Sequence, residues 1–178
     1  MIINRVWAMP NKWTFQIKPI AELVARYVGD GKGWIDPFAG MNSPAEITND
    51  LNPEMPTDYH LDALIFLKTL PSESASGVLF DPPYSFYELL RCYKGIGKVD
   101  NKWGEHNAFW SKCRRQIARI IKLNGISISF GWNTIGIGKT NGFEQKEILL
   151  VCHGGARNDT IVTVEIKRYN QKVMELKI

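Results

Sequence analysis

Four aspartates follow short apolar segments of the sequence, each where a strand is expected to end: Asp36, Asp50, Asp62 and Asp81. In open α/β sheets, ligands bind outside the carboxyl ends of the strands, so these carboxylates would be presented along one edge. One aspartate in such a position is commonly a helix cap or a turn former. Four in succession repel one another unless a ligand or hydrogen bonds satisfy them. The series therefore indicates a binding site at this edge.

The elements that would position these aspartates alternate between strands and helices. A helix over 19–28 is indicated by apolar residues at i, i+3, i+4 and i+7, behind a proline that suits the first helical position. The run GVLFDPPY at 77–84 is apolar on both faces, which is typical of a central strand in a parallel sheet. The other expected elements are strands at 34–38, 45–52, 58–61, 124–132, 145–153 and 160–168, helices at 62–70 and 106–123, and an irregular segment at 85–106.

The order of these elements predicts the fold class. Strands that alternate with helices, followed by two strands joined through the turn residues GGARND, are typical of an α/β fold with a mostly parallel sheet and a closing hairpin. The 178 residues contain no internal repeat and no long linker. We therefore expect a single domain spanning residues 1–178.

The composition limits the classes of protein to consider. A net charge of +4 fits a polyanionic partner, and it fits a solvated basic face as well. Cys92, Cys113 and Cys152 lack CxxC spacing and the three histidines lack metal-ligand spacing, so we expect neither a disulfide framework nor a metal site. The sequence has no apolar stretch of membrane-spanning length and no signal-peptide core, so a soluble cytoplasmic protein is expected.

Three motifs resemble those of the amino-methyltransferases, which methylate exocyclic nitrogens of DNA bases with S-adenosylmethionine. IKPIAELVARY (17–27) is similar to their motif X, DPFAG (36–40) to motif I and DPPY (81–84) to motif IV, in the order of the γ group. The resemblance covers about residues 15–168 and implies a Rossmann-like class I methyltransferase fold, with a mostly parallel twisted sheet closed by an antiparallel C-terminal hairpin. The chain is most similar in plan to small phage-like forms that have no separate target-recognition domain. A bacterial or phage-infected host cell is the setting that this resemblance implies.

The resemblance makes DPPY the catalytic motif, formed by Asp81, Pro82, Pro83 and Tyr84. An exocyclic amine is a poor nucleophile because its lone pair is delocalised into the ring. Asp81 could accept one of its N–H groups and the Pro82 carbonyl the other, and both bonds strengthen as the nitrogen gains positive charge. The prolines would make the turn rigid, and Tyr84 would stack on a flipped base. Alternatively, DPPY is only a turn in which proline ends the strand.

The cofactor site is carried over from the family in the same way. Motif I would lie beside the methionine part of S-adenosylmethionine, and Lys18 would either meet its carboxylate or be solvated. Asp50 would accept the ribose hydroxyls. Asp62 would take the adenine amino group, or it could equally be only the N-cap of the next helix. The full predicted set is Lys18, Pro19, Asp36, Pro37, Phe38, Ala39, Gly40, Asp50, Asp62 and Ala63.

The segment after motif I departs from the family pattern. The sequence continues as GMNSPAEI, and only about eight residues separate Phe38 from Ile47. A parallel crossover normally takes a dozen residues or more. We therefore expect reduced helix content after the first strand of the motif.

Basic and aromatic residues interleave in the segment 85–106, as single-stranded or flipped nucleic acid requires. A solvated, mobile loop is equally compatible with this composition. A second basic set at 114–122 and Arg157 could likewise face phosphates or only solvent, and Trp132 could line a base pocket or belong to the core. The residues predicted to contact the substrate are Tyr87, Arg91, Lys94, Trp103 and Trp132.

Two classes of function are therefore compatible with the sequence. The first is an S-adenosylmethionine-dependent methyltransferase acting on DNA, with adenine N6 favoured by the aspartate of DPPY. Cytosine N4, RNA and protein glutamine are alternative substrates of the same chemistry. The second class is a non-catalytic, methyltransferase-like subunit that binds nucleic acid. A homodimer or a partner subunit that supplies specificity is compatible with both, and neither class requires a metal or a membrane.

Overall fold

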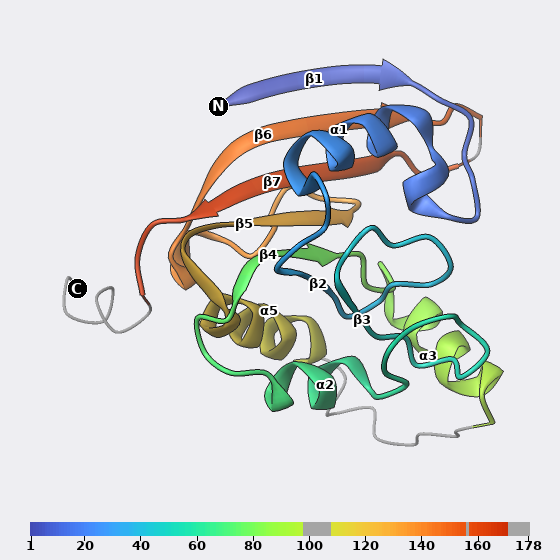
Figure 1. Cartoon of the computed structure of the whole chain (residues 1–178). Helices are drawn as coiled ribbons and strands as arrows, with labels where there is room; N and C mark the ends of the chain where they lie inside the picture. Colours follow the sequence, from blue (N-terminus) through green and yellow to red (C-terminus); the bar gives the residue numbers. More distant parts are fainter. Residues whose placement is uncertain (98–107, 156, 171–178) are drawn as a thin grey trace.

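The computed structural model describes residues 1–97, 108–155 and 157–170 of the chain. These residues form one sheet of seven strands in the order β1-β6-β7-β5-β4-β2-β3 (Figure 1). The strands are β1 (Ile2–Trp7), β2 (Trp34–Asp36), β3 (Ile47–Thr48), β4 (Ala75–Phe80), β5 (Ile121–Gly131), β6 (Phe143–Cys152) and β7 (Thr160–Lys167).

The sheet is mostly parallel and is closed by a C-terminal hairpin. The strands β5, β4, β2 and β3 pair in parallel, and β1 pairs in parallel with β6 at the opposite edge. The hairpin β6–β7 is antiparallel, and β7 pairs antiparallel with β5. This arrangement confirms the predicted fold class. As the sequence suggested, β4 lies inside the sheet, between β5 and β2.

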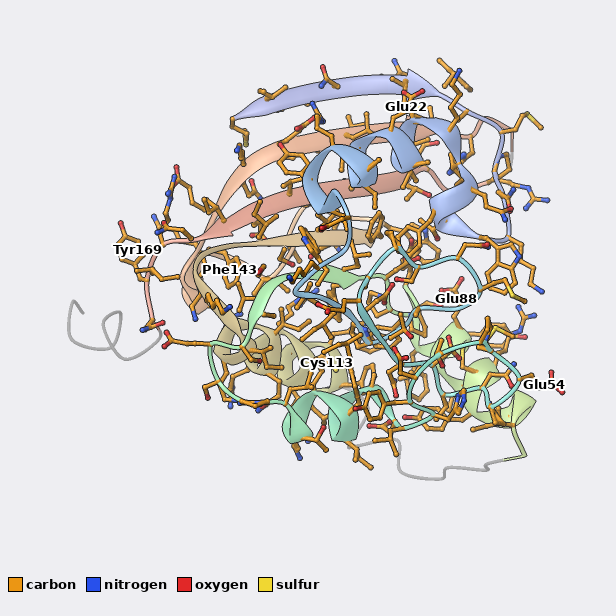
Figure 2. The ribbon with its side chains drawn as sticks, in the orientation of Figure 1. Glu22, Glu54, Glu88, Cys113, Phe143 and Tyr169 are labelled. Carbon is orange, nitrogen blue, oxygen red and sulfur yellow. The ribbon has the colours of Figure 1, made fainter. Side chains whose placement is uncertain are left out.

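Helices cover both faces of the sheet. The helix α1 (Lys18–Val28) packs on one face, while α2 (Ala63–Thr69) and α5 (Phe109–Ile120) pack on the other. Figure 2 shows the side chains that fill these layers, including Cys113 of α5, which is fully buried against the sheet. None of the described helices is long and apolar enough to cross a membrane.

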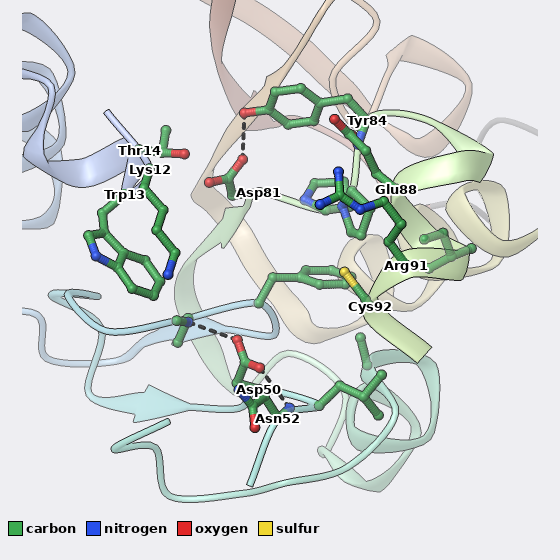
Figure 3. A pocket seen from close by; sticks show the side chains of 18 of the residues that line it. Lys12, Trp13, Thr14, Asp50, Asn52, Asp81, Tyr84, Glu88, Arg91 and Cys92 are labelled. Carbon is green, nitrogen blue, oxygen red and sulfur yellow. Dashed lines mark hydrogen bonds between the residues drawn. The ribbon is translucent and has the colours of Figure 1, made fainter. Parts of the chain in front are cut away.

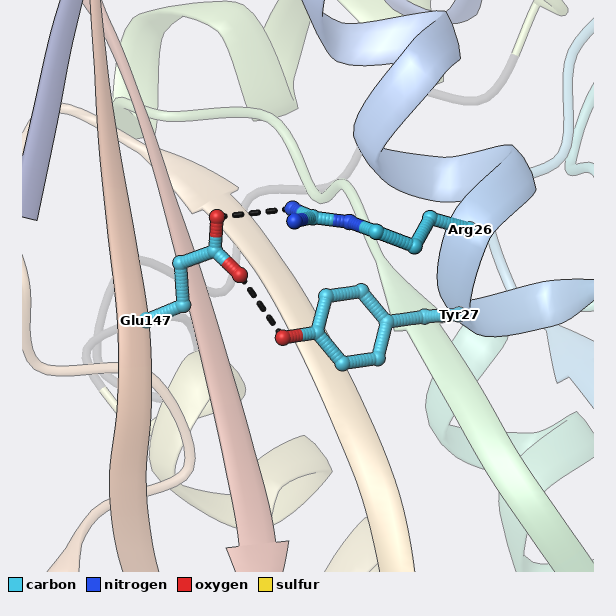
Figure 4. Close-up of polar contacts among 3 residues, drawn as sticks. All are labelled: Arg26, Tyr27 and Glu147. Atoms are coloured by element: carbon cyan, nitrogen blue, oxygen red, sulfur yellow. Dashed lines mark hydrogen bonds and ion pairs between the residues drawn. The ribbon is translucent and has the colours of Figure 1, made fainter. Parts of the chain in front are cut away.

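One polar cluster fixes α1 on the sheet. Glu147 of β6 is almost fully buried and accepts hydrogen bonds from Arg26 Nη2 and Tyr27 Oη, both at 2.7 Å (Figure 4). Burial opposes ionisation of Glu147, but the hydrogen bonds from Tyr27 and Arg26 outweigh it and lower its pKa. Because these bonds satisfy the buried carboxylate, they hold α1, and with it the preceding segment 12–17, in a defined position.

The loop between β2 and β3 agrees with the expectation from the sequence. Residues 37–46, all of which are described, contain no helix, so the usual crossover helix is missing here. The expected strand at 58–61 is wrong, because this segment contributes only the isolated bridge between Asn49 and Tyr59.

Two further elements differ from the expectation. Part of the supposedly irregular segment 85–106 is a helix, α3 (Phe86–Gly95), whose N-cap Ser85 accepts a hydrogen bond from the Glu88 amide. The N-terminal strand β1 was not predicted at all. Its residues are almost all exposed at the edge of the sheet, so the burial pattern that reveals other strands is absent from its sequence.

Candidate active site

A cavity of about 1000 Å³ lies at the carboxyl ends of the strands (Figure 3). Its walls come from the segments that follow β2, β3, β4, β5 and β6, together with α3 and the N-terminal segment 10–17. This volume is at the upper end of the range for small-molecule sites, which is about 300–1000 Å³. The cavity therefore has room for two ligand groups side by side.

Asp81 follows the last residue of β4 and lines this cavity, with Tyr84 beside it (Figure 3). The Tyr84 hydroxyl donates a hydrogen bond to Asp81 Oδ1 at 2.6 Å. Burial raises the pKa of Asp81, and polar contacts with Thr14 and Tyr84 offset this only in part. Asp81 is thus a desolvated hydrogen-bond acceptor whose position is fixed by short polar contacts.

Hydrogen bonds fix the second half of the DPPY turn, at Pro83 and Tyr84. The Pro83 carbonyl accepts from Trp110 Nε1 at 2.9 Å, and the Tyr84 amide donates to Glu88 Oε2 at 2.8 Å. The Tyr84 ring meets Trp132 edge to face, with the ring centroids 5.7 Å apart. Burial, with the adjacent Asp81 charge, raises the pKa of Tyr84 well above its usual value, so its hydroxyl remains a hydrogen-bond donor.

Asp50 lies beside the DPFAG segment, across the cavity from Asp81 (Figure 3). Its Oδ2 accepts from the Gly40 amide at 3.0 Å and its Oδ1 accepts from the Asn52 amide at 2.8 Å. A carboxylate has about four acceptor positions. Asp50 therefore keeps acceptor capacity for two further hydroxyl groups.

Asp62 is the N-cap of α2, which confirms the structural role that the sequence allowed for it. Its Oδ1 accepts from the Leu64 and Ile65 amides, and its Oδ2 accepts from the Tyr93 hydroxyl. Asp62 and Ala63 also line the cavity. Contact of Asp62 with an adenine amino group stays a prediction. Asp62 Oδ2 would then accept a hydrogen bond from the amino group, either beside the Tyr93 hydroxyl or in its place.

Asp36 is fully buried and is not among the residues that line the cavity. It accepts from the Phe38 amide at 2.9 Å and from the Ser43 hydroxyl at 2.6 Å. Burial raises its pKa to about 7, although both hydrogen bonds act in the opposite direction. Within the structure, Asp36 shapes the loop that presents Pro37, Phe38, Ala39 and Gly40 to the cavity.

The remaining predicted residues divide into two sets. Arg91 of α3 and Trp132 after β5 line the cavity. Four others do not: Lys18 is exposed at the start of α1 beside Pro19, and Tyr87 and Lys94 are exposed on α3. Trp103 lies outside the described residues.

Sequence reasoning missed the wall formed by Lys12, Trp13 and Thr14 (Figure 3). The Lys12 ammonium lies 4.8 Å from the centre of the Trp13 ring. Gly40 has a φ of +54°, in the left-handed region that favours glycine. A Cβ on this residue would also lie only 3.0 Å from the Trp13 ring, so both the backbone conformation and the close approach require glycine. The adjacent basic and aromatic residues of NKWTF were the available signal.

The arrangement suits a ligand with hydroxyl groups at one end and a planar amine at the other. Acceptors stand at Asp50 and Asp81, and rings line the cavity between and beside them, including Phe38, Trp13 and Tyr84. Among the described residues, no group of three or more His, Cys, Asp or Glu is placed to hold a metal ion.

Solved structures that resemble this fold include the following two. TrmN from Thermus thermophilus superimposes with a TM-score of 0.56 at 15% identity, over 85% of this chain and 49% of its own. A Haemophilus influenzae protein, HI0767, provisionally described as a methylase, gives a TM-score of 0.51 at 11% identity over 85% of this chain and 88% of its own. This chain thus spans about half the length of TrmN. Neither a protein-family model nor a curated protein matches the sequence.

The chain has the Rossmann-like α/β fold that these two structures share, with a mostly parallel sheet and an antiparallel β6–β7 hairpin. At this identity the likeness concerns the fold. A shared fold does not determine the reaction, which depends on the residues of the cavity.

Proposed function

We propose that this protein transfers a methyl group from S-adenosylmethionine to an exocyclic amine of a nucleic-acid base, with adenine N6 in DNA as the favoured substrate. The observation that supports the proposal best is the placement of Asp50 and Asp81 in one cavity, after parallel strands. Two carboxylate acceptors in one cavity, Asp50 beside the DPFAG segment and Asp81 in the DPPY turn, match a cofactor and a base bound side by side. The cofactor would supply the electrophilic methyl group.

The part of the cavity about Asp50 fits the cofactor. Asp50 retains acceptor capacity after binding the Gly40 and Asn52 amides, so it can receive the two hydroxyls of a ribose. Phe38, Leu89 and Phe109 give this region apolar surface that suits a purine ring. Asp62 stands next to them at the start of α2 as a polar group for the purine edge.

The part about Asp81 fits the amine. Asp81 accepts one N–H and the Pro82 carbonyl accepts the other, so that the nitrogen lone pair faces the methyl donor. To bind the amine through Oδ1, Asp81 exchanges the Tyr84 hydroxyl for the amine N–H. The Tyr84 ring, held by Trp132 and by the Glu88 bond, then covers the base. A desolvated carboxylate stabilises the positive charge that develops on nitrogen more strongly than water does.

A base inside a duplex cannot reach this cavity, so the substrate is a single-stranded or flipped nucleotide. Arg91, Lys12 and Arg157 bring positive charge to the cavity wall, which suits a phosphate backbone. The aspartate of DPPY favours adenine over cytosine within this chemistry. RNA remains a second polymer with the same exocyclic amines.

The test is incubation with isotope-labelled S-adenosylmethionine and DNA or RNA, followed by nucleoside analysis by mass spectrometry. We expect the label in N6-methyladenine from DNA, most strongly with single-stranded substrate. Label in N4-methylcytosine or in RNA would keep the methyl transfer and change the substrate. Cofactor and nucleic acid that both bind without any transfer would overturn the proposed reaction in favour of a non-catalytic subunit.

A further inference from the structure

A second cavity, of about 430 Å³, lies against the DPPY motif. It shares Pro82, Tyr84 and Trp132 with the large cavity, so the edge-to-face pair of Tyr84 and Trp132 belongs to the walls of both. Its other walls come from the start of α3, from α5 and from the end of β5. Nothing in the proposed methyl transfer uses this space.

Arg114 of α5 lines this second cavity, and its guanidinium forms no hydrogen bond or ion pair with another described residue. Its Nε is buried and has no hydrogen bond to any described residue. No described carboxylate lies within 4.0 Å of its guanidinium, and burial lowers the pKa of Arg114, which the more distant charge of Glu165 offsets only in part. A half-buried cation without a partner destabilises the fold, and a bound anion would offset this cost.

Another arginine of the same helix shows what a structural role looks like. Arg119 uses all three of its nitrogens, with Nε bound to Gln116 Oε1, Nη1 to Ser72 Oγ and Nη2 to the Leu67 carbonyl. The bonds to Leu67 and Ser72 connect α5 to α2 and to the segment after it. Arg114 makes no comparable contact among the described residues, so holding the helix in place does not explain it.

The rest of the lining suits an anion. Ser85 and Ser129 bring hydroxyl groups and Asn133 brings an amide, while the Ser111 hydroxyl donates to the Ala108 carbonyl and no described aspartate or glutamate lines the cavity. Guanidinium and hydroxyl groups around a space free of carboxylates are the usual surroundings of a bound phosphate. Trp110 and Trp132 add ring faces to the same walls.

We infer that the second cavity binds a phosphodiester group of the nucleic-acid strand, next to the nucleotide whose base occupies the large cavity, with Arg114 as its principal ligand. The inference rests on the proposed function for the position of the target base. Successive nucleotides of a stacked strand rise by about 3.4 Å, so a neighbouring phosphate lies within reach of a cavity that shares three residues with the first. The strand would then pass over the Tyr84–Trp132 pair with a phosphate anchored beyond it.

The test measures binding of a fluorescent single-stranded oligonucleotide by anisotropy, without cofactor, over a series of salt concentrations. Arg114→Gln should weaken binding by about tenfold or more, because a charge-assisted contact is lost, and should reduce the salt slope by about one phosphate contact. Arg115→Gln removes the same charge from an exposed position of the same helix and should change affinity by less than about twofold. Equal losses in the two variants would overturn the inference.

A second readout separates ligand binding from folding. Removing an unpaired, half-buried charge should leave the melting temperature of Arg114→Gln equal to or above that of the wild type. A lower melting temperature with unchanged oligonucleotide affinity would assign Arg114 a structural role and contradict the inference. Stabilisation of the wild type by inorganic phosphate, without oligonucleotide binding, would also contradict it, since the ligand would then be a free anion.

These measurements do not depend on methyl transfer. If the wild type transfers no methyl group but Arg114→Gln still loses oligonucleotide affinity, the proposed reaction fails while the phosphate site stands. If the wild type transfers methyl groups and Arg114→Gln binds the oligonucleotide as well as the wild type does, the phosphate site fails while the proposed reaction stands.

Discussion

Two neighbouring strands of the sheet, β2 and β4, each end at the cavity, but the segments that follow them are built differently. After β2 the chain forms a loop without a helix over 37–46, held by bonds between polar side chains and the backbone. After β4 it makes a rigid turn and continues directly into α3, held by rings and by a capped helix. The same edge of one sheet thus carries a loop held by its own polar side chains and a turn held by hydrogen bonds to Trp110 and Glu88 together with ring packing.

The difference explains how the protein can lack the crossover helix after β2. Asn49, fully buried, donates to the Pro37 and Leu61 carbonyls and accepts from the Leu61 amide. Asp36 and Asp50 bind backbone amides of the same loop. Because these side chains satisfy the backbone groups that a helix would otherwise satisfy, the loop still presents DPFAG to the cavity. We expect substitutions in this loop to affect folding and cofactor binding together, and substitutions after β4 to affect transfer alone.

The largest effect is expected for Asp81→Asn, which removes the charge and keeps the shape. Methyl transfer should fall by about a hundredfold to a thousandfold, the usual cost of losing an electrostatic contact at the transition state. Cofactor affinity should stay within about twofold, because Asp50 lies in the other part of the cavity. Initial rates with labelled cofactor measure the first quantity and calorimetry the second. Asp58→Asn, outside the cavity, is the control, and a rate for Asp81→Asn within tenfold of it would refute the assigned role.

Asn49→Ala tests the polar organisation of the loop after β2. The change leaves three backbone groups without their side-chain partner, one of them the buried Pro37 carbonyl, so the free energy of unfolding should fall by about 2–4 kcal/mol. Cofactor affinity should fall with it, because Gly40 and Asp50 lose their support. Urea unfolding measures the stability. A variant as stable as the wild type would show that packing rather than polar bonding holds this loop.

Asp36 predicts how the same loop responds to pH. Its folded pKa of about 7 lies above the unfolded value near 3.8, so over this interval the folded state binds more protons than the unfolded state. Its contribution to stability is therefore present at low pH and is lost as the pH rises through 7. Burial also raises the pKa of Glu165 to about 7, so its contribution to stability falls over the same pH range.

The measurement is the melting temperature from pH 5 to pH 8. The wild type should lose stability over this range, and Asp36→Asn should lose less, because one of the two titrating groups is gone. Identical slopes in the two proteins would mean that Asp36 does not titrate in this range.

The smallest effect is expected for Tyr84→Phe. The ring that packs against Trp132 remains, and only the hydroxyl that donates to Asp81 is lost. Transfer should change by less than about fivefold and in either direction, since the bond both orients Asp81 and competes with the amine. Tyr84→Ala, which removes the ring as well, should lose far more activity. Equal rates for the two variants would show that the ring contributes nothing.

Much of the fold follows from local patterns in the sequence. The helix α1 has four buried apolar residues at helical spacing, and β4 is apolar on both faces, so each shows its environment in its own residues. The shortened loop after β2 was predictable from its length alone. The N-cap role of Asp62 was predictable from its position before an apolar run.

Other elements are specified by contacts that are distant in sequence. Almost every residue of strand β1 is exposed, and the strand forms because it pairs with β6. In this pairing Ile2 lies opposite Glu147, more than 140 residues away in the sequence. Trp13 reaches the cavity because Glu147 holds α1 against the sheet, which no local pattern shows. The helix α3 could have been predicted, since Phe86, Leu89, Leu90 and Tyr93 have helical spacing. The neighbouring glycines and aromatic residues favoured a loop instead.

The most direct test of the central claim is calorimetric titration of S-adenosylmethionine into the protein. We predict one site on the wild type, at least about tenfold weaker binding to Asp50→Ala through loss of the ribose contacts, and binding to Asp81→Asn close to that of the wild type. Absence of heat and of any thermal shift with the wild type at millimolar cofactor would contradict the proposed function, because the cavity would then hold no methyl donor.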